Sequence, residues 1–156
     1  MRLTEGLQLM VMSSRFNNLL VVLLIQAMSA QAEELQPFSS DGCSAFPDGT
    51  LKQNDLWLVC CQDHDFAYWK GGTYQERLTS DKELETCVSK VGEPEIALLM
   101  LAGVRVGGSP FFPMQFRWGY GWPYPRFYGK HTKQELEQIK NLTSKGTGRE
   151  KAAPVL

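Results

Sequence analysis

Four cysteines, two of them adjacent, constrain the fold of this 156-residue chain more than any other feature of its sequence. They are Cys43, Cys60, Cys61 and Cys87. In a short chain with an export signal, an even number of cysteines indicates two disulfides. Adjacent cysteines seldom bridge each other, so two of the three possible pairings remain. A zinc site is disfavoured, because neighbouring cysteines lack the spacing that lets a chain wrap around a metal.

The N-terminus has the pattern of a secretory signal peptide. Basic residues precede an apolar run over residues 19–25, and a small-x-small sequence follows at residues 30–32. We therefore expect cleavage after Ala32, which removes residues 1–32 and makes the protein secreted or periplasmic. A buried N-terminal helix is the alternative for this segment. The apolar run is too short to span a bilayer, and no later segment predicts a transmembrane helix.

The remaining composition is that of a globular chain with almost no net charge. The formal net charge is −1, and the lysines and arginines are scattered along the sequence. A nucleic-acid partner is therefore not expected, since binding a phosphate backbone requires clustered positive charge. Residues 144–156 are expected to form a flexible tail. One small domain is then expected over residues 33–143.

Two neighbouring helices are expected, one that contains the adjacent cysteines and one that contains Cys87. The first is predicted from about residue 55 to residue 70, with Asn54 as its N-cap and two glycines after its last turn. The second begins after Thr73, which has the spacing of a capping box with Glu76, and continues to about Val91. The short connection makes the two helices antiparallel neighbours.

The rest of the domain is expected to be helical except for one aromatic segment. An apolar helix over residues 94–104 is expected in the core, and a polar helix is expected over residues 132–142. Between them, residues 107–129 combine glycines, prolines and aromatic rings without periodicity, which predicts an irregular loop or a short hairpin. Over residues 111–128 the rings either form a second small core or contact a lipid interface. The expected fold class is mainly α.

The sequence CCQDHD carries the clearest candidates for catalysis. On a helix, Cys60, His64 and Tyr68 lie four residues apart along one stripe. Cys61 and Asp65 form a second stripe beside the first. The two cysteines can therefore connect the two stripes to different parts of the chain.

One of the two remaining pairings gives His64 a partner. If Cys60 bridges to Cys87 on an antiparallel helix, Asp81 lies opposite His64 between the helices. A histidine whose ring is held by a carboxylate is an oriented general base. An arbitrary histidine is more often structural, but two disulfides near His64 and an aspartate beside it favour catalysis.

The same pairing also places a loop beside Asp65. The second disulfide would then join Cys43 to Cys61, and would tie the loop over residues 41–49 to the stripe that carries Asp65. Backbone carbonyl groups beside a carboxylate are the oxygen ligands that a hard cation such as calcium prefers. We therefore expect a cation site next to the candidate base.

The CCxxHD sequence, followed by Tyr68 and Asp81 at their present spacings, resembles the active-site helices of secreted phospholipases A2. The resemblance covers about residues 41–90, and the loop sequence DGCS is similar to the calcium-loop opening of divergent members of that family. It implies a mainly helical fold in which two antiparallel, disulfide-linked helices lie beside a calcium-binding loop. The implied disulfides are Cys43–Cys61 and Cys60–Cys87.

The resemblance also implies a function and a set of site residues. The implied activity is calcium-dependent hydrolysis of the sn-2 acyl ester of glycerophospholipids in membranes or micelles. His64 would activate water, Asp81 would orient His64, and Tyr68 would donate a hydrogen bond to Asp81. The implied calcium ligands are Asp65 and the carbonyl oxygens of Gly42, Ser44 and Phe46.

Two departures from the family pattern affect these expectations. Ala67 and Ser80 occupy positions that carry a further disulfide in many members. The loop over residues 44–49 contains fewer glycines than the commonest calcium loop, so the carboxylate of Asp41 or Asp48 could replace a carbonyl ligand.

Two other functions compete with the phospholipase hypothesis. The first is a catalytically silent module that binds membranes or a protein partner on the same scaffold. The second is a hydrolase of esters other than phospholipids, because a histidine–aspartate dyad does not specify the acyl donor. The retention of Asp65 favours an enzyme over the silent module.

Overall fold

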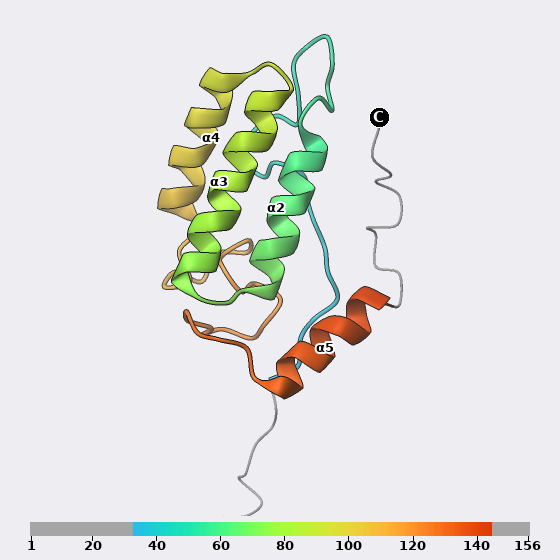
Figure 1. The fold of residues 1–156 in the computed structure, drawn as a ribbon, viewed down its shortest axis with the longest axis vertical. Coiled ribbons are helices and arrows are strands. Elements are labelled where there is room, and N and C mark those ends of the chain that lie inside the picture. Colours follow the sequence, from blue (N-terminus) through green and yellow to red (C-terminus); the bar gives the residue numbers. More distant parts are fainter. Residues whose placement is uncertain (1–32, 145–156) are drawn as a thin grey trace, which may run out of the picture. The chain divides into compact units, whose positions relative to one another are not determined.

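The computed structural model describes residues 33–144, so the expected signal peptide over residues 1–32 lies outside the described residues. Residues 34–144 belong to one compact unit. Its described helices are α2 (Leu58–Lys70), α3 (Tyr74–Lys90), α4 (Pro94–Gly107) and α5 (Lys133–Ser144), shown in Figure 1. No strand occurs among residues 33–144, which confirms a mainly helical fold. The expected tail also lies outside the described residues, except for its first residue, which ends α5.

Helix α2 begins at Leu58, three residues later than predicted, and Asn54 is not its N-cap. The N-cap is Trp57, whose side chain makes no capping hydrogen bond. Instead, the Trp57 indole donates to the Pro47 carbonyl at 2.6 Å, and its backbone N–H donates to the Asp48 carbonyl at 3.0 Å. The helix start is therefore fixed by contacts with the preceding loop, which a local capping pattern cannot reveal.

Helix α3 begins as predicted. The Thr73 hydroxyl accepts the Glu76 backbone N–H at 3.2 Å, and the Glu76 carboxylate accepts the Thr73 N–H at 2.6 Å, so the capping box is complete. Helix α5 begins with the same device, which links Thr132 and Glu135. Both starts depend on side chains within four residues, which is why their positions can be predicted from the sequence.

Two disulfides are present, which confirms that expectation, and they join Cys43 to Cys61 and Cys60 to Cys87. Further along α2, His64 contacts Asp81 on α3. Residue numbers thus fall along α3 as they rise along α2, so the two helices run in opposite directions (Figure 1). The disulfide at one end and the dyad in the middle hold the same two helices together.

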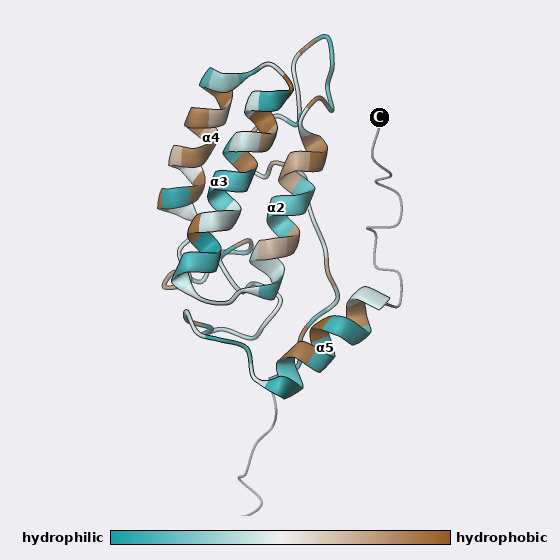
Figure 2. Ribbon diagram, viewed as in Figure 1, coloured by the Kyte–Doolittle hydropathy of each residue, from teal (hydrophilic) through white to brown (hydrophobic). Residues whose placement is uncertain are grey.

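Helix α4 packs against α3 and extends to Gly107, three residues beyond the predicted end. Its inner face contributes Ala97 and Met100 to a core with Trp57, Leu84 and Val88. We expected this helix to be core, but only one face of it is buried. Leu98 and Leu99 are 59% and 57% exposed, and Val106 is 81% exposed. Figure 2 shows the hydrophobic character of α4. No helix among residues 33–144 is long and apolar enough to cross a membrane.

The aromatic segment is irregular, as expected, and its rings divide between core and surface. Trp122 packs with Leu35 and Trp69 in a second core, and Trp118 is buried as well. The Trp118 indole donates to the Gly72 carbonyl at 2.9 Å, and the Trp122 indole donates to the Lys70 carbonyl at 2.7 Å. The segment therefore closes the end of α2 with its tryptophans. Its exposed rings include Phe111, Phe112, Tyr124 and Phe127.

Candidate active site

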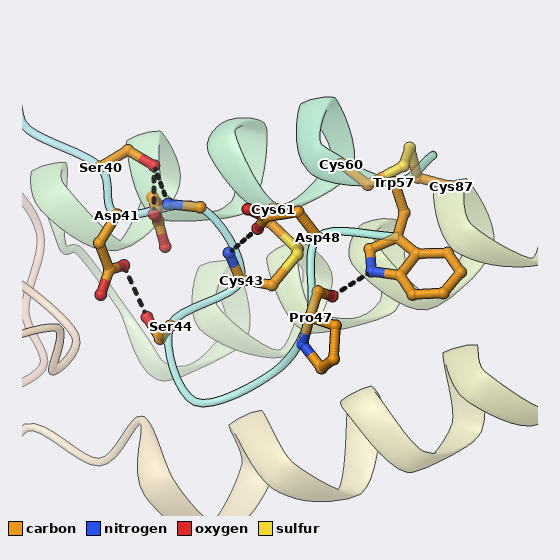
Figure 3. Close-up of a disulfide and its surroundings, with 12 residues drawn as sticks. Ser40, Asp41, Cys43, Ser44, Pro47, Asp48, Trp57, Cys60, Cys61 and Cys87 are labelled. Carbon is orange, nitrogen blue, oxygen red and sulfur yellow. Dashed lines mark hydrogen bonds between the residues drawn. A yellow bond between two sulfur atoms is a disulfide. The ribbon is translucent and has the colours of Figure 1, made fainter. Parts of the chain in front are cut away.

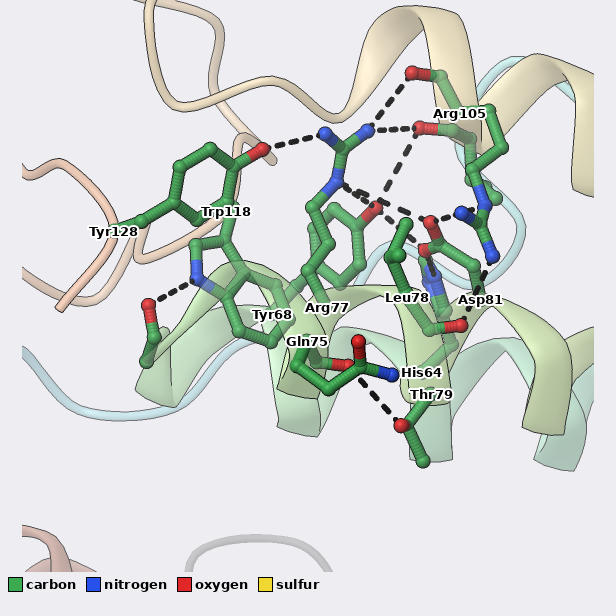
Figure 4. A network of polar contacts seen from close by, with 12 residues as sticks. His64, Tyr68, Gln75, Arg77, Leu78, Thr79, Asp81, Arg105, Trp118 and Tyr128 are labelled. Carbon is green, nitrogen blue, oxygen red and sulfur yellow. Dashed lines mark hydrogen bonds and ion pairs between the residues drawn. The ribbon is translucent and has the colours of Figure 1, made fainter. Parts of the chain in front are cut away.

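His64 and Asp81 face each other between α2 and α3 (Figure 4). The distance from His64 Nε2 to Asp81 Oδ1 is 3.0 Å, and the two residues are 8% and 0% exposed. A carboxylate at Nε2 assigns the proton to that nitrogen. Nδ1 then remains as the acceptor, and it makes no hydrogen bond to another residue between 33 and 144. This is the arrangement of an oriented general base.

Tyr68 lies one turn after His64 and contacts the same carboxylate. Its hydroxyl donates to Asp81 Oδ1 at 2.7 Å, and its ring centroid is 4.2 Å from that of His64. Burial and the negative charge of Asp81 raise the pKa of the Tyr68 hydroxyl above its ordinary value. The hydroxyl therefore stays protonated and remains a hydrogen-bond donor to Asp81. The structure thus brings His64, Asp81 and Tyr68 together.

Gly108 supports this position of Tyr68 and provides a sharp test of it. A Cβ added to Gly108 would lie 2.4 Å from the Tyr68 hydroxyl oxygen, although the glycine φ of −82° is acceptable for any residue. We expect Gly108→Ala to displace the Tyr68 ring and to lower the free energy of unfolding by about 1–3 kcal/mol. Denaturant unfolding would measure this change.

Gly103→Ala is the matched control for this substitution. A Cβ at Gly103 meets nothing within 4 Å, and the position lies inside α4. Alanine there should raise the free energy of unfolding by about 0.5–1 kcal/mol, because alanine favours a helix more than glycine does. Equal stabilities for the two variants would show that Gly108 does not confine Tyr68.

Two arginines that the sequence analysis did not identify complete the surroundings of Asp81. Arg105 Nε lies 2.9 Å from Asp81 Oδ2, and Arg77 Nε lies 3.9 Å from the same oxygen. Arg77 precedes Asp81 by four residues on α3, a spacing that places two side chains on one helix face. This spacing in the sequence could therefore have identified Arg77 as a neighbour of Asp81. Arg105 comes from α4, and only the packing of α4 against α3 brings it to the site.

Arg77 contacts Tyr68 within the site and connects the site to two other parts of the fold. Its Nε donates to the Tyr68 hydroxyl at 3.0 Å, and its Nη1 donates to the Tyr128 hydroxyl at 2.7 Å. Its Nη2 donates to the carbonyl groups of Val104 and Arg105 at 2.8 and 2.9 Å. These carbonyls belong to the last turns of α4, where a cation is favoured by the helix dipole.

Asp65 points away from the dyad, toward the loop that precedes α2. The Ser40 hydroxyl donates to Asp65 Oδ2 at 2.6 Å and accepts the Gly42 backbone N–H at 3.1 Å. The pKa of the Asp65 carboxyl is raised to about 7, chiefly by burial and also by the charges of Asp41 and Asp48, whereas the Ser40 hydrogen bond lowers it. A buried carboxyl group thus lies in a negative environment. Ser40 was not among the predicted site residues.

The two loop aspartates are held by bonds within the loop (Figure 3). Asp48 Oδ1 accepts the Cys43 backbone N–H at 2.8 Å, and Asp41 Oδ1 accepts the Ser44 hydroxyl at 2.9 Å. Gly42 has a φ of 80°, and a Cβ there would lie 2.4 Å from Asp48 Oδ1, so glycine is required at this turn. The conformation of the loop is therefore fixed in part by the side chains of Asp41 and Asp48.

Two of the predicted calcium ligands share the partner Ser40, which accepts the Gly42 backbone N–H and donates to the Asp65 carboxylate. Ser44 and Phe46 lie farther along the same loop. Within residues 33–144, no group of three or more histidine, cysteine, aspartate or glutamate side chains is placed to hold a metal ion.

An open groove of about 760 Å³ runs along the surface between α2 and α3, and His64 is among its lining residues. Ala67 and Ser80, which occupy the positions of the missing family disulfide, line it too. Lys70, Lys82 and Lys90 are also part of the groove wall, and the rest of the wall includes apolar side chains.

Comparison with family models, curated proteins and solved structures finds no match for this chain. The case for a function therefore depends on the contacts of its own residues.

Proposed function

We propose that this chain is a calcium-dependent ester hydrolase of the phospholipase A2 type, which cleaves the sn-2 acyl ester of glycerophospholipids in membranes or micelles. The observation that carries the proposal is the buried arrangement of His64, Asp81 and Tyr68, with Nε2 and the phenol both on one carboxylate oxygen. The adjacent residue, Asp65, supports it by contacting the loop that precedes α2.

His64 acts in this proposal as the general base. Nδ1 takes a proton from a water molecule while that water adds to the ester carbonyl carbon. Asp81 holds the Nε2 proton and stabilises the imidazolium that forms. The imidazolium then returns a proton to the leaving alkoxide as the acyl–oxygen bond breaks. The products are a fatty acid and a lysophospholipid.

The surroundings of Asp65 fit a hard cation. Asp65 is 5% exposed and has two acidic neighbours, and no lysine or arginine between residues 33 and 144 forms an ion pair with it. Carboxylate and carbonyl oxygens are the ligands that calcium prefers. The proposed ligands are Asp65 and the carbonyl oxygens of Gly42, Ser44 and Phe46. When bound, calcium would supply positive charge for the phosphate and the ester carbonyl.

The groove lined by His64 supports a substrate with an acyl chain. Its volume of about 760 Å³ lies within the range of small-molecule sites in proteins. Phe66, Leu78 and Leu84 supply apolar wall that suits an acyl chain. We expect part of the substrate to occupy this groove.

The experiment that tests the proposal compares two kinds of ester. Fatty-acid release from mixed phospholipid vesicles and hydrolysis of soluble short-chain esters are measured with the oxidised protein and calcium. The proposal predicts faster cleavage of phospholipid. Cleavage of soluble esters alone would replace the phospholipase proposal with that of a general ester hydrolase.

One observation favours the silent binding module as a second candidate. The outer face of α4 and the following loop expose Leu98, Leu99, Val106, Phe111 and Phe112. Exposed apolar groups of this kind occur where proteins bind lipid or other proteins. Vesicle binding without cleavage of either ester would favour this function over the enzyme.

A further inference from the structure

The orientation of Asp81 depends on both of its carboxylate oxygens. Oδ1 contacts His64 and Tyr68 on α2, whereas Oδ2 faces the two arginines. Asp81 is 0% exposed, so water does not surround either oxygen. Rotation of the carboxyl group about its Cβ–Cγ bond would move Oδ1 away from His64. What holds Oδ2 therefore also determines where Oδ1 points.

Arg105 is the closer of the two cations to this oxygen. The distance from its Nε to Oδ2 is 2.9 Å, compared with 3.9 Å for Arg77. The Arg77 donors are already used by Tyr68, Tyr128 and the end of α4. In contrast, Arg105 has its Nη2 on the Leu78 carbonyl at 3.0 Å, which fixes the guanidinium against α3 (Figure 4).

The contact between Arg105 and Asp81 is an ion pair and not an aligned hydrogen bond, since Oδ2 has no hydrogen-bond partner of ordinary geometry among the described residues. Its effect on the carboxylate is therefore electrostatic and acts over a short distance. Asp81 is buried and the Arg105 side chain is 36% exposed, so water screens this attraction only in part.

We propose that Arg105 is a positioning residue for the base: by holding Oδ2, it keeps Asp81 Oδ1 directed at His64 Nε2. Arg105 on α4 therefore affects the orientation of His64 on α2 through Asp81, which lies between them. The proposal rests on the proposed function for its kinetic readout. Its spectroscopic readout does not depend on any activity.

The first readout is the tautomer of His64. A long-range ¹H–¹⁵N spectrum is recorded at about pH 8, where an ordinary histidine is neutral. The chain has two histidines, so a His131→Gln variant assigns the signals. Wild type should show His64 protonated at Nε2, and Arg105→Met should show a mixture of tautomers. An unchanged single tautomer in Arg105→Met would overturn the proposal, whether or not the protein hydrolyses an ester.

The second readout is the division of the kinetic effect between kcat and KM. Arg105→Met should lower kcat by about 10- to 100-fold, because a displaced catalytic group loses that much rate. KM should stay within about threefold, since Arg105 does not contact substrate. Arg105→Lys should recover part of the loss. A fall in thermal stability with unchanged kcat per folded molecule would assign Arg105 a structural role only.

Two further variants make the comparison decisive. Arg126→Met is the same type of substitution at an arginine that pairs with Glu135 outside the groove, and it should change neither readout. Arg105→Gln replaces the methionine variant if that variant does not fold, because its amide can still donate to the Leu78 carbonyl. The same tautomer mixture and kcat loss are expected for Arg105→Gln, and their absence would overturn the proposal. If the wild-type protein hydrolysed no ester, the proposed function would be wrong, and the tautomer measurement would still test the role of Arg105.

Discussion

Replacing His64 by glutamine is expected to lower the rate of ester hydrolysis by about 10²–10⁴-fold, the usual contribution of a general base. Glutamine has an amide that can still donate to Asp81 Oδ1, which His64 Nε2 contacts at 3.0 Å. It has no nitrogen that can take a proton from water. The fold should therefore survive while catalysis is lost, and steady-state hydrolysis with thermal unfolding of each variant would measure both.

His131→Gln is the matched control, since it is the same substitution at the other histidine. His131 Nε2 contacts the Lys70 carbonyl at 2.9 Å, beyond the end of the candidate site. The control should keep nearly all of the activity. If His64→Gln kept more than about a tenth of the wild-type rate, His64 would not be the base.

Asp65 is expected to make the stability of the protein depend on pH and calcium together. Burial raises its pKa from 3.8 to about 7, so in the folded protein the neutral acid is favoured over a wider range. The stability that Asp65 contributes is complete below about pH 4 and is lost as the pH rises through about 7. In chelator, the melting temperature should therefore fall between those values.

In the proposed site calcium would bind the ionised carboxylate, so its addition should reverse this loss. The increase in melting temperature on adding calcium should be larger at pH 8 than at pH 5, and differential scanning fluorimetry would measure it. Asp65→Asn should remove both the fall in chelator and the recovery in calcium. Asp63→Asn, at an exposed position on the same helix, should keep both. Equal responses from the two variants would mean that Asp65 does not bind the cation.

The parts of the fold that depend on neighbouring residues could be predicted from the sequence. The Thr73–Glu76 capping box fixes the start of α3, and the glycines at residues 71 and 72 end α2 with φ values of 69° and 134°. The periodicity of α2 also places His64 and Tyr68 on one face, where both reach Asp81. The capping box, the glycines and the spacing of His64 and Tyr68 each depend on residues that are close together in the sequence.

The parts that depend on tertiary packing could not be predicted. Trp57 starts α2 because its indole and backbone N–H bond to the preceding loop, and no local pattern encodes that contact. Arg105 reaches Asp81 only because α4 packs against α3. Ser40 reaches Asp65 because the Cys43–Cys61 disulfide and the loop bring the two together. The sequence also left open which aromatic rings are buried, since the segment has no periodicity.

The proposed function is tested most directly by fatty-acid release from mixed phospholipid vesicles, measured for the oxidised protein with calcium, with chelator, and with His64→Gln in place of wild type. Wild type should release fatty acid in calcium and stop in chelator, and His64→Gln should release at least about tenfold less. Release that continues in chelator, or that His64→Gln retains above about a tenth of the wild-type rate, would show that the protein is not this hydrolase.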